Sequence, residues 1–278
     1  MMFAVWLQGA RWLTAGMVMS LAGFLAVTSW PFWKALGLSP LWDPQWYPYE
    51  DRFGLLAAVV GTLWSVGIAL AFAVPSALAA AILMEEILPG RPRTWLRVGM
   101  ETLAGIPSIV HGLIGLWVIL PWLQETFGLL TGHNLLAAGG ILALMILPTV
   151  MVLSADALRG VSTQQREAAL ALGLDWPALL RRVLLPQAWG GIQGAILLAT
   201  GRALGETVAV MLVVGSIDRL PEPLWNLLQP AQTLTSRIGR EVGETVFGSL
   251  HFSALMACAL LLALMGCGAG WLARHRPC

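Results

Sequence analysis

Six long apolar stretches constrain this chain more than any other feature of its sequence. A helix needs about 20 apolar residues to cross a hydrocarbon core about 30 Å thick, and each stretch reaches that length. Only 11% of the residues are charged, which excludes an ordinary soluble domain, where about a quarter are. We therefore expect an all-α integral membrane protein with about six transmembrane helices. The expected spans are residues 12–33, 53–84, 102–123, 135–155, 190–217 and 252–273.

The first two stretches have unusual lengths. Residues 12–33 exceed the apolar core of a secretory signal peptide, which has about 7 to 15 residues, so we expect an uncleaved span. Residues 53–84 contain no charged side chain after Phe53 and are too long for one perpendicular crossing. This second span must tilt, kink near Pro75 or continue along the membrane surface.

Basic residues predict the orientation, because short loops rich in arginine and lysine stay on the cytoplasmic side. With a cytoplasmic N-terminus, ten basic residues fall inside, five fall outside, and Arg202 lies within the fifth span. The inner residues are Arg11, Arg91, Arg93, Arg97, Arg159, Arg166, Arg181, Arg182, Arg274 and Arg276. The outer residues are Lys34, Arg52, Arg219, Arg237 and Arg240. We expect a multi-pass protein of the inner (plasma) membrane with both termini in the cytoplasm.

Neither the net charge nor the cysteines indicate another class of protein. A net charge of +1 gives no electrostatic footprint for nucleic acid, and we expect no such partner. Cys258 and Cys267 fall on opposite faces of one predicted helix, and Cys278 is terminal, so no disulfide framework is expected. We also expect no metal and no cofactor.

The cytoplasmic loop at residues 156–189 is long for a simple connection and predicts two short helices. Asp175 is placed to cap the second helix, with Pro177 in its first turn. Gly173 breaks the chain between the two helices, so that they meet at an angle. Arg181 and Arg182 flank an apolar face that fits a groove on a partner; this face comprises Leu179, Leu180, Val183 and Leu184. The alternative is an amphipathic helix lying on the lipid surface.

The same loop carries the sequence EAALALGLDWPALLRRVLLP. It resembles the EAA loop of ABC-importer permeases in Glu167, Ala168, Ala169, Gly173, Val183, Leu185 and Pro186. The departure is Val183, where that family usually has isoleucine. The resemblance implies the type I ABC-importer transmembrane fold and a coupling helix that docks a cytoplasmic ABC ATPase dimer.

ATP hydrolysis is expected in a partner subunit and not in this chain. A P-loop requires G-x-x-x-x-G-K-[ST], and the only lysine is Lys34, outside any such motif. We therefore expect a transporter permease subunit and not an enzyme.

Two charges in the fifth stretch need an explanation. Arg202 and Glu206 fall near its midpoint, where each charge costs about 2.5 to 3.5 kcal/mol on insertion scales. On a continuous helix, residues four apart share a face. They are expected either to neutralise each other while packing helices, or to leave Arg202 presenting its other donors to a passing oxyanion, with Glu206 moderating the affinity.

Longer stretches narrow the resemblance to the permeases of phosphate (Pst) importers, and to the C-type subunit of the two. The matching segments are AGIPSIVHGLIGL from Ala104, GRALGETVAVMLVVG around Arg202, TLTSRI from Thr233, Gly243-Glu244, and HFSAL from His251. The resemblance covers about residues 55–273 and implies a second permease subunit in a heterodimer and an external phosphate-binding protein. It implies a substrate pathway at Arg202, Glu206, Thr207 and Ser108. His111 replaces a common tyrosine; we expect it to be packed or hydrogen-bonded.

An outer loop carries a second group of polar candidates, Thr233, Thr235, Ser236 and Arg237. They are expected to bind an anion or dock the binding protein, or else to belong to a solvated loop. The pattern Arg-x-x-Gly-Glu-Thr-Val occurs at Arg202 and again at Arg240, and its unlike flanks favour coincidence.

The expected organisation is a first span with its outer loop (residues 1–52), a permease core (53–273) containing the coupling loop (156–189), and a short basic tail (274–278). Permeases for molybdate, tungstate or sulfate are the alternative within the class. An intramembrane enzyme is disfavoured: Ser108 and His111 lie three apart, but no G-x-S-x-G or H-E-x-x-H motif is present. A passive channel is also disfavoured, because a channel needs no EAA loop to dock an ATPase.

Overall fold

The computed structural model describes residues 2–274, which are helical except for connecting loops and two short strands. Within that range, six helical segments are long and apolar enough to cross a membrane. This confirms the all-α class and the number of spans. The segments are Gln8–Leu36, Leu56–Ile87, Ser108–Phe127, Leu135–Arg159, Trp176–Gly205 and Leu250–Trp271.

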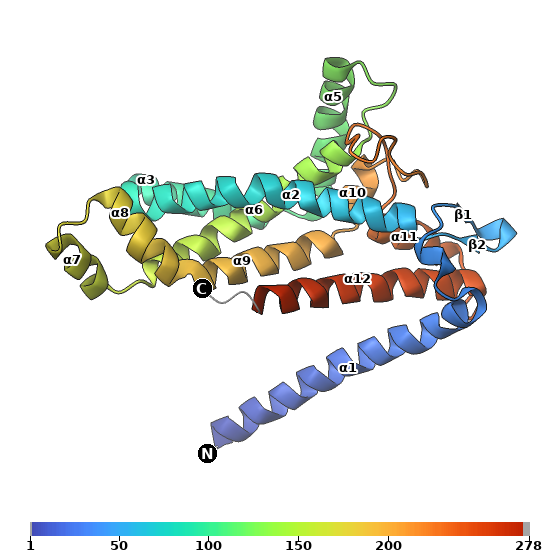
Figure 1. Ribbon diagram of the computed structural model, residues 1–278, viewed down its shortest axis with the longest axis horizontal. Helices are drawn as coiled ribbons and strands as arrows, with labels where there is room; N and C mark the ends of the chain where they lie inside the picture. The colour runs from blue at the N-terminus through green and yellow to red at the C-terminus, as the bar shows by residue number, and fades with distance from the viewer. Residues whose placement is uncertain (1, 275–278) are drawn as a thin grey trace.

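Four long helices run side by side through the molecule, and α7 and α8 connect α6 to α9 at one end (Figure 1). The β1–β2 hairpin and α11 lie at the opposite end, and α5 projects away from the other helices. The four long helices are α2 (Leu56–Ile82), α6 (Leu135–Arg159), α9 (Leu185–Gly205) and α12 (Leu250–Arg274). The others are α1 (Met2–Leu36), α3 (Gly90–Ala104), α4 (Ser108–Ile114), α5 (Leu120–Phe127), α7 (Thr163–Ala171), α8 (Trp176–Leu179), α10 (Val208–Val213) and α11 (Leu234–Glu241).

Single turns of other helix types complete the chain. Turns of π-helix occupy Leu83–Ile87, Gly115–Ile119 and Leu180–Leu184. Turns of 3₁₀-helix occupy Ser39–Leu41, Pro48–Glu50 and Val242–Glu244.

The centre of the bundle is the contact between α2 and α6. Ala69, Ala73, Ala77 and Ala81 recur every fourth residue along α2, and all are fully buried. Such a row of small side chains forms one ridge of the helix and allows close approach of a neighbour. α2 continues through Pro75 and ends in the π-helical turn, so the long second stretch is one extended helix.

α1 is held mainly at its C-terminal end. There Phe32 is buried in an apolar cluster with Trp46 and Phe53 of the hairpin and Leu255 of α12. The two strands, β1 (Trp46–Tyr47) and β2 (Arg52–Phe53), pair antiparallel. The rest of α1 diverges from α12 (Figure 1) and exposes large apolar side chains, as expected for a surface that faces lipid or another subunit.

The third and fifth spans differ from the sequence prediction. The third begins at Ser108 and not at residue 102, because α3 ends at Ala104 and Pro107, which has no N–H to donate, precedes α4. The fifth is a helix from Trp176 to Gly205, whereas a continuous helix over residues 190–217 was expected.

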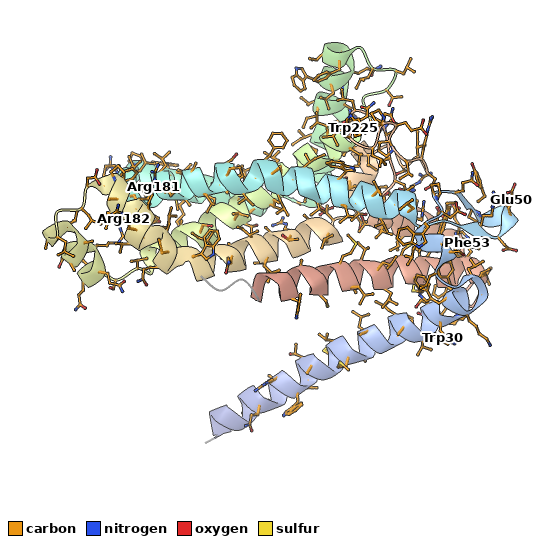
Figure 2. All side chains as sticks on the ribbon, viewed as in Figure 1. Trp30, Glu50, Phe53, Arg181, Arg182 and Trp225 are labelled. Carbon is orange, nitrogen blue, oxygen red and sulfur yellow. The ribbon has the colours of Figure 1, made fainter. Side chains whose placement is uncertain are left out.

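The two ends of the bundle differ in chemistry. Figure 2 places Arg181 and Arg182 at the α7–α8 end, and Glu50 and Phe53 at the end that carries the hairpin. Cys258 is buried and Cys267 is exposed, and both are free, as their spacing predicted. The expected tail at residues 274–278, Arg274 apart, lies outside the described residues.

Candidate functional site

The fifth span is interrupted in the middle of the motif that carries the two charges. α9 ends at Gly205, Glu206 has extended backbone (φ −74°, ψ 122°), and α10 begins at Val208. Oε1 of Glu206 accepts a hydrogen bond from the backbone N–H of Ala209 at 3.2 Å. Glycine weakens the helix, and a side-chain cap satisfies one of the donors that a new helix start exposes.

Arg202 and Glu206 are therefore not a pair on one helix face, and that prediction is wrong. Nη1 of Arg202 donates to Oγ1 of Thr149 at 3.3 Å, and no ion pair with Arg202 occurs among residues 2–274. Thr149 lies 14 residues after the start of α6 and 10 before its end. A half-buried guanidinium thus sits near mid-depth with one neutral side-chain partner.

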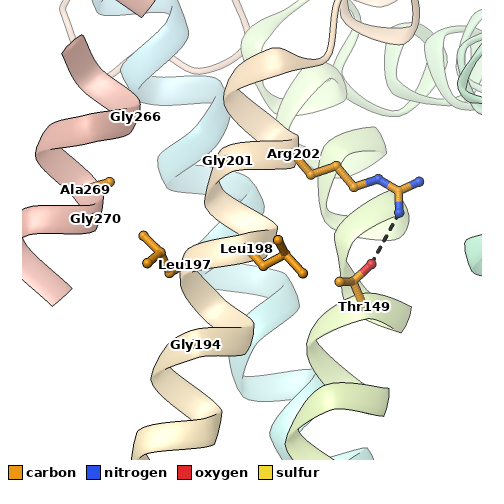
Figure 3. Close-up of a pocket in the computed structure, with 9 residues that line it drawn as sticks. All are labelled: Thr149, Gly194, Leu197, Leu198, Gly201, Arg202, Gly266, Ala269 and Gly270. Atoms are coloured by element: carbon orange, nitrogen blue, oxygen red, sulfur yellow. Dashed lines mark hydrogen bonds between the residues drawn. The ribbon is translucent and has the colours of Figure 1, made fainter. Parts of the chain in front are cut away.

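A cavity of about 720 Å³ adjoins Arg202 between α9 and α12. Its lining residues are Thr149, Gly194, Leu197, Leu198, Gly201, Arg202, Gly266, Ala269 and Gly270. Figure 3 shows Arg202 extending from α9 towards Thr149 of α6, away from α12. The four glycines have open space where a Cβ would stand, so this face admits the close approach of another element.

A second interruption, at residues 105–107, lies at the same level as the first. α4 packs on α10: a Cβ at Gly112 would meet Ala209 and Leu212, and one at Gly115 would meet Val213. The two short helices are therefore parallel, with Ser108 near the level of Glu206. The structure brings all four predicted pathway residues to two helix breaks and the turn before them. Interrupted helices near mid-membrane form substrate sites in other transporter folds.

Two polar groups border these breaks. Thr207 is half-buried, and its methyl group packs against Gly239 of α11. A Cβ on Gly239 would lie only 2.7 Å from the Cγ2 atom of Thr207. His111 is 2% exposed; its Nδ1 lies 3.4 Å from the carbonyl oxygen of Pro107, and its Nε2 has no hydrogen-bond partner. His111 is packed in the interior, as expected.

The polar candidates of the outer loop are not in a loop and are not at the surface. Thr233 caps α11, and all four of its group are buried. Arg237, fully buried, forms an ion pair with Asp218, donates to the carbonyl oxygen of Gly54 at 3.1 Å, and lies 4.1 Å from the Trp46 ring centroid. Both a docking contact and a solvated loop require exposed side chains, so this placement corrects these two expectations. Binding of an anion by these residues stays a prediction. The partners of Arg237 come from other elements, so the residues around Arg237 in the chain did not indicate them.

The coupling loop has the predicted glycine break and aspartate cap. α7 ends at Ala171, Gly173 has a positive φ of 78°, and α8 starts after Asp175. Oδ1 of Asp175 accepts from the N–H of Ala178 at 3.1 Å, and Pro177 lies in the first turn. Residues 156–189 therefore contain one short helix, α7, which meets the start of the long helix Trp176–Gly205 at a glycine. A second short helix was expected, but α8 continues through the π-helical turn into α9 without a break.

The face that this loop offers to a partner differs from the predicted one. Leu179 and Leu184 are buried in the core, and Leu180 and Val183 pack against it. The exposed apolar side chains are Leu172, at 81%, with Leu170 and Trp176. The four predicted residues still share one face through the π-helical turn at residues 180–184, and the core of the same chain covers that face.

The motif residues divide between these two faces. Glu167, Ala168, Gly173 and Pro186 are exposed, Ala169 is buried, and Val183 and Leu185 are half-buried. Sequence reasoning also missed Thr149, Gly266 and Gly270. The glycines at 266, 268 and 270 are a small-residue signal that could have indicated a close helix contact.

The fold, the mid-depth arginine and the coupling loop define a transport permease, and comparison with known proteins specifies its family. The sequence profile described as "Binding-protein-dependent transport system inner membrane component" matches residues 77–275. The chain belongs to this family. It is a multi-pass membrane component of a transporter, not an enzyme.

Individual relatives are more specific. The chain is 36% identical over 269 residues to the "Phosphate transport system permease protein PstC" of Mesorhizobium japonicum, covering 88% of this chain and 81% of that protein. It is 34% identical over 257 residues to the protein of the same name in Haemophilus influenzae, covering 86% and 80%. It is 34% identical to the "Probable ABC transporter permease protein YqgH" of Bacillus subtilis, covering 93% and 86%.

Solved structures confirm the architecture. A chain of the inward-facing MetNI methionine ABC transporter superposes with a TM-score of 0.57 at 19% identity, covering 79% of this chain and 93% of that one. A chain of a bacterial ABC transporter involved in alginate import superposes at 0.58 with 14% identity, covering 98% and 97%. These likenesses establish the type I ABC-importer permease fold.

Proposed function

We propose that this chain is the membrane-spanning subunit of an ATP-driven importer of inorganic phosphate. The observation that carries the proposal is Arg202, a guanidinium near mid-depth whose side-chain partner among residues 2–274 is the Thr149 hydroxyl. A guanidinium offers five donors in a rigid fork that matches an oxyanion, and its charge attracts an anion most strongly where screening is weakest. The relatives named as phosphate permeases favour phosphate over molybdate, tungstate or sulfate.

Glu206 has a different role in this proposal from the one that its spacing suggested. Its carboxylate caps α10 and leaves the guanidinium of Arg202 free for the substrate. Phosphate at neutral pH carries a proton that sulfate lacks, so a carboxylate beside the path accepts a hydrogen bond from phosphate and only repels sulfate. Glu206 therefore shapes the break and contributes to anion selectivity, while Thr207 and Ser108 supply hydroxyl donors at the same level.

Three kinds of protein partner complete the transporter. A cytoplasmic ABC ATPase dimer docks on the exposed part of the coupling loop at Leu170, Leu172 and Trp176. A second permease subunit, in a heterodimer, covers the glycine-rich cavity between α9 and α12, and an external phosphate-binding protein delivers the anion. The arginine-rich α7–α8 end then faces the cytoplasm with both termini. Residues 53–273 act as the permease core, and residues 1–52 as an added span.

Transport by the reconstituted complex tests the function. The chain, its cognate ATPase, second permease and binding protein are placed in proteoliposomes, and uptake of radiolabelled phosphate is followed. Uptake should require ATP and the binding protein, and unlabelled sulfate or molybdate should compete poorly. Uptake of molybdate that phosphate does not inhibit would refute the substrate assignment.

Co-purification tests the coupling loop. Gly173 adopts a left-handed backbone, which costs a residue with a side chain about 1–2 kcal/mol, so Gly173→Leu should distort the loop and lose the ATPase. Gly140→Ala is the matched control, because Gly140 has open space beside it and lies on α6. Retention of the ATPase by Gly173→Leu would argue against this docking surface.

A further inference from the structure

Two consecutive carboxylates are buried at the end of the second span, next to the coupling loop. Glu85 and Glu86 lie in the π-helical turn that follows α2, and their side chains are 3% and 6% exposed. Burying a charge costs several kcal/mol unless a partner compensates it. Each carboxylate has arginine partners, but the two sets of partners belong to different parts of the chain.

Glu86 is bound by Arg166, which stands immediately before Glu167 in α7. Nη1 of Arg166 donates to both carboxylate oxygens of Glu86, at 2.8 and 2.7 Å. Nη2 of Arg166 donates to the carbonyl oxygen of Leu158, in the last turn of α6, at 2.9 Å. One guanidinium therefore joins the coupling helix to the ends of both central helices.

Glu85 makes the opposite kind of connection. It is paired with Arg93 of α3 and with Arg159 at the end of α6, where Nη2 of Arg159 lies 2.9 Å from Oε1. These contacts join membrane helices to one another and do not include α7. Of the two adjacent carboxylates, Glu86 thus forms an ion pair with the coupling loop, whereas the ion pairs of Glu85 stay among the membrane helices.

The covalent connections of α7 are poorly suited to transmit force. Residues 160–162 separate it from α6, and Gly173, in a left-handed conformation, separates it from α8. Leu170 and Leu172 are exposed on the side available to a partner, whereas Arg166 lies half-buried against α2 and α6. A displacement applied at the exposed side would bend these joints unless a non-covalent contact carries it into the bundle.

We propose that the Glu86–Arg166 ion pair transmits the movement of the coupling helix to α2 and α6. Arg166 and Glu86 are positioning residues: they touch neither substrate nor nucleotide, and act by holding α7 in register with the two central helices. This inference rests on the proposed function, since it assumes that a partner moves the loop. α6 carries Thr149, the partner of Arg202, so the contact leads from the loop towards the substrate site.

The measured quantity is the number of anions transported per ATP hydrolysed by the complete complex in proteoliposomes. In Arg166→Gln, co-purification of the ATPase should persist while this ratio falls about tenfold, within the usual range for coupling between sites. The charge exchange Glu86→Arg with Arg166→Glu should recover at least half of the ratio. Arg97→Gln, which removes an exposed pair with Asp156 at the same end, should leave the ratio unchanged.

The results separate the possible failures. An unchanged ratio in Arg166→Gln, or equal losses of transport and hydrolysis, would overturn the proposed transmission. If Arg166→Gln does not assemble, Arg166→Lys is used instead, because it keeps the charge but lacks the guanidinium that contacts both Glu86 and the Leu158 carbonyl. An undiminished ratio in Arg166→Lys would equally overturn the proposed transmission. Failure of the proposed function appears earlier and separately, because the unmodified complex would then transport no phosphate; the ratio is measurable with whichever anion it does transport.

Discussion

Arg202 and Arg237 stand in two regions that use the same side chain in opposite ways. At the end of the bundle that carries the β1–β2 hairpin, Arg237 is fully buried, with an ion pair to Asp218, a carbonyl acceptor at Gly54 and the Trp46 ring beneath it. Near mid-depth, Arg202 is half-buried beside a cavity and donates to one hydroxyl. A guanidinium whose charge is already compensated stabilises the fold, whereas one that keeps free donors can bind a passing anion.

The largest effect is expected from removing Arg237. Arg237→Met leaves Asp218 without its partner and removes the contact with Trp46, so stability should fall by about 3 kcal/mol. The measurement is thermal unfolding of the purified protein in detergent. Arg219→Met is the control, because the Arg219–Glu222 pair is exposed and should contribute less than about 1 kcal/mol. Equal stability of the two variants would remove the distinction between the two regions.

Arg202→Lys should impair transport without impairing folding. The substitution keeps the charge but loses the planar fork, and hydrogen bonds to charged groups are worth about 1.5–3 kcal/mol. Phosphate uptake should therefore fall about tenfold to a hundredfold, with unchanged thermal unfolding. Arg240→Lys is the control, since Arg240 begins the second copy of the motif but is exposed and bonds only the Ser216 carbonyl among the described residues. Normal uptake by Arg202→Lys would assign Arg202 to helix packing.

Two substitutions at Glu206 distinguish the effect of its negative charge from the effect of its hydrogen bond to the start of α10. Glu206→Ala removes the acceptor for the Ala209 N–H and should destabilise the break by about 1 kcal/mol. Glu206→Gln keeps an acceptor oxygen, so stability should hold while sulfate becomes a better competitor of phosphate uptake. Competition by sulfate that is identical in Glu206→Gln and the unmodified protein would contradict a role in selectivity.

The smallest effect is expected at Thr149. Thr149→Val removes the hydroxyl that orients Arg202, and a neutral hydrogen bond is worth about 0.5–1.5 kcal/mol, so uptake should fall about threefold. Thr102→Val is the control, because the Thr102 hydroxyl is exposed and its hydrogen bond within residues 2–274 is to the Val98 carbonyl of its own helix. A loss as large as that of Arg202→Lys would mean that Thr149 itself contacts the substrate.

Much of the fold was predictable because its signals are local. The apolar stretches predicted the number of spans, and the boundaries of the fourth and sixth agree closely with the structure. The same holds for Gly173 and the Asp175 cap, whose effects depend on a few neighbouring residues. The role of the candidate pathway residues stays a prediction, but the structure shows where they lie: Ser108, Glu206 and Thr207 at two helix breaks, and Arg202 in the turn before the second break.

Three features depended on contacts between distant segments. The Arg202–Glu206 spacing indicated a pair, but the capped break after Gly205 separates them. The polar run at Thr233–Arg237 suggested a surface, but Asp218, Trp46 and Gly54 enclose Arg237. The apolar face of the coupling loop is buried in this chain's own core, and Leu172 is left exposed.

The sequence by itself therefore determined a six-span permease with a coupling loop, since hydropathy, glycine and capping residues act within a few turns of the chain. Only the tertiary structure decided which arginine is compensated and which remains available. Compensation requires a carboxylate, a carbonyl or an aromatic ring within a few ångströms, and in Arg237 these come from residues 19 to 191 positions away along the chain. The residues next to an arginine in the sequence do not indicate which residues, so far away along the chain, will surround it in the fold.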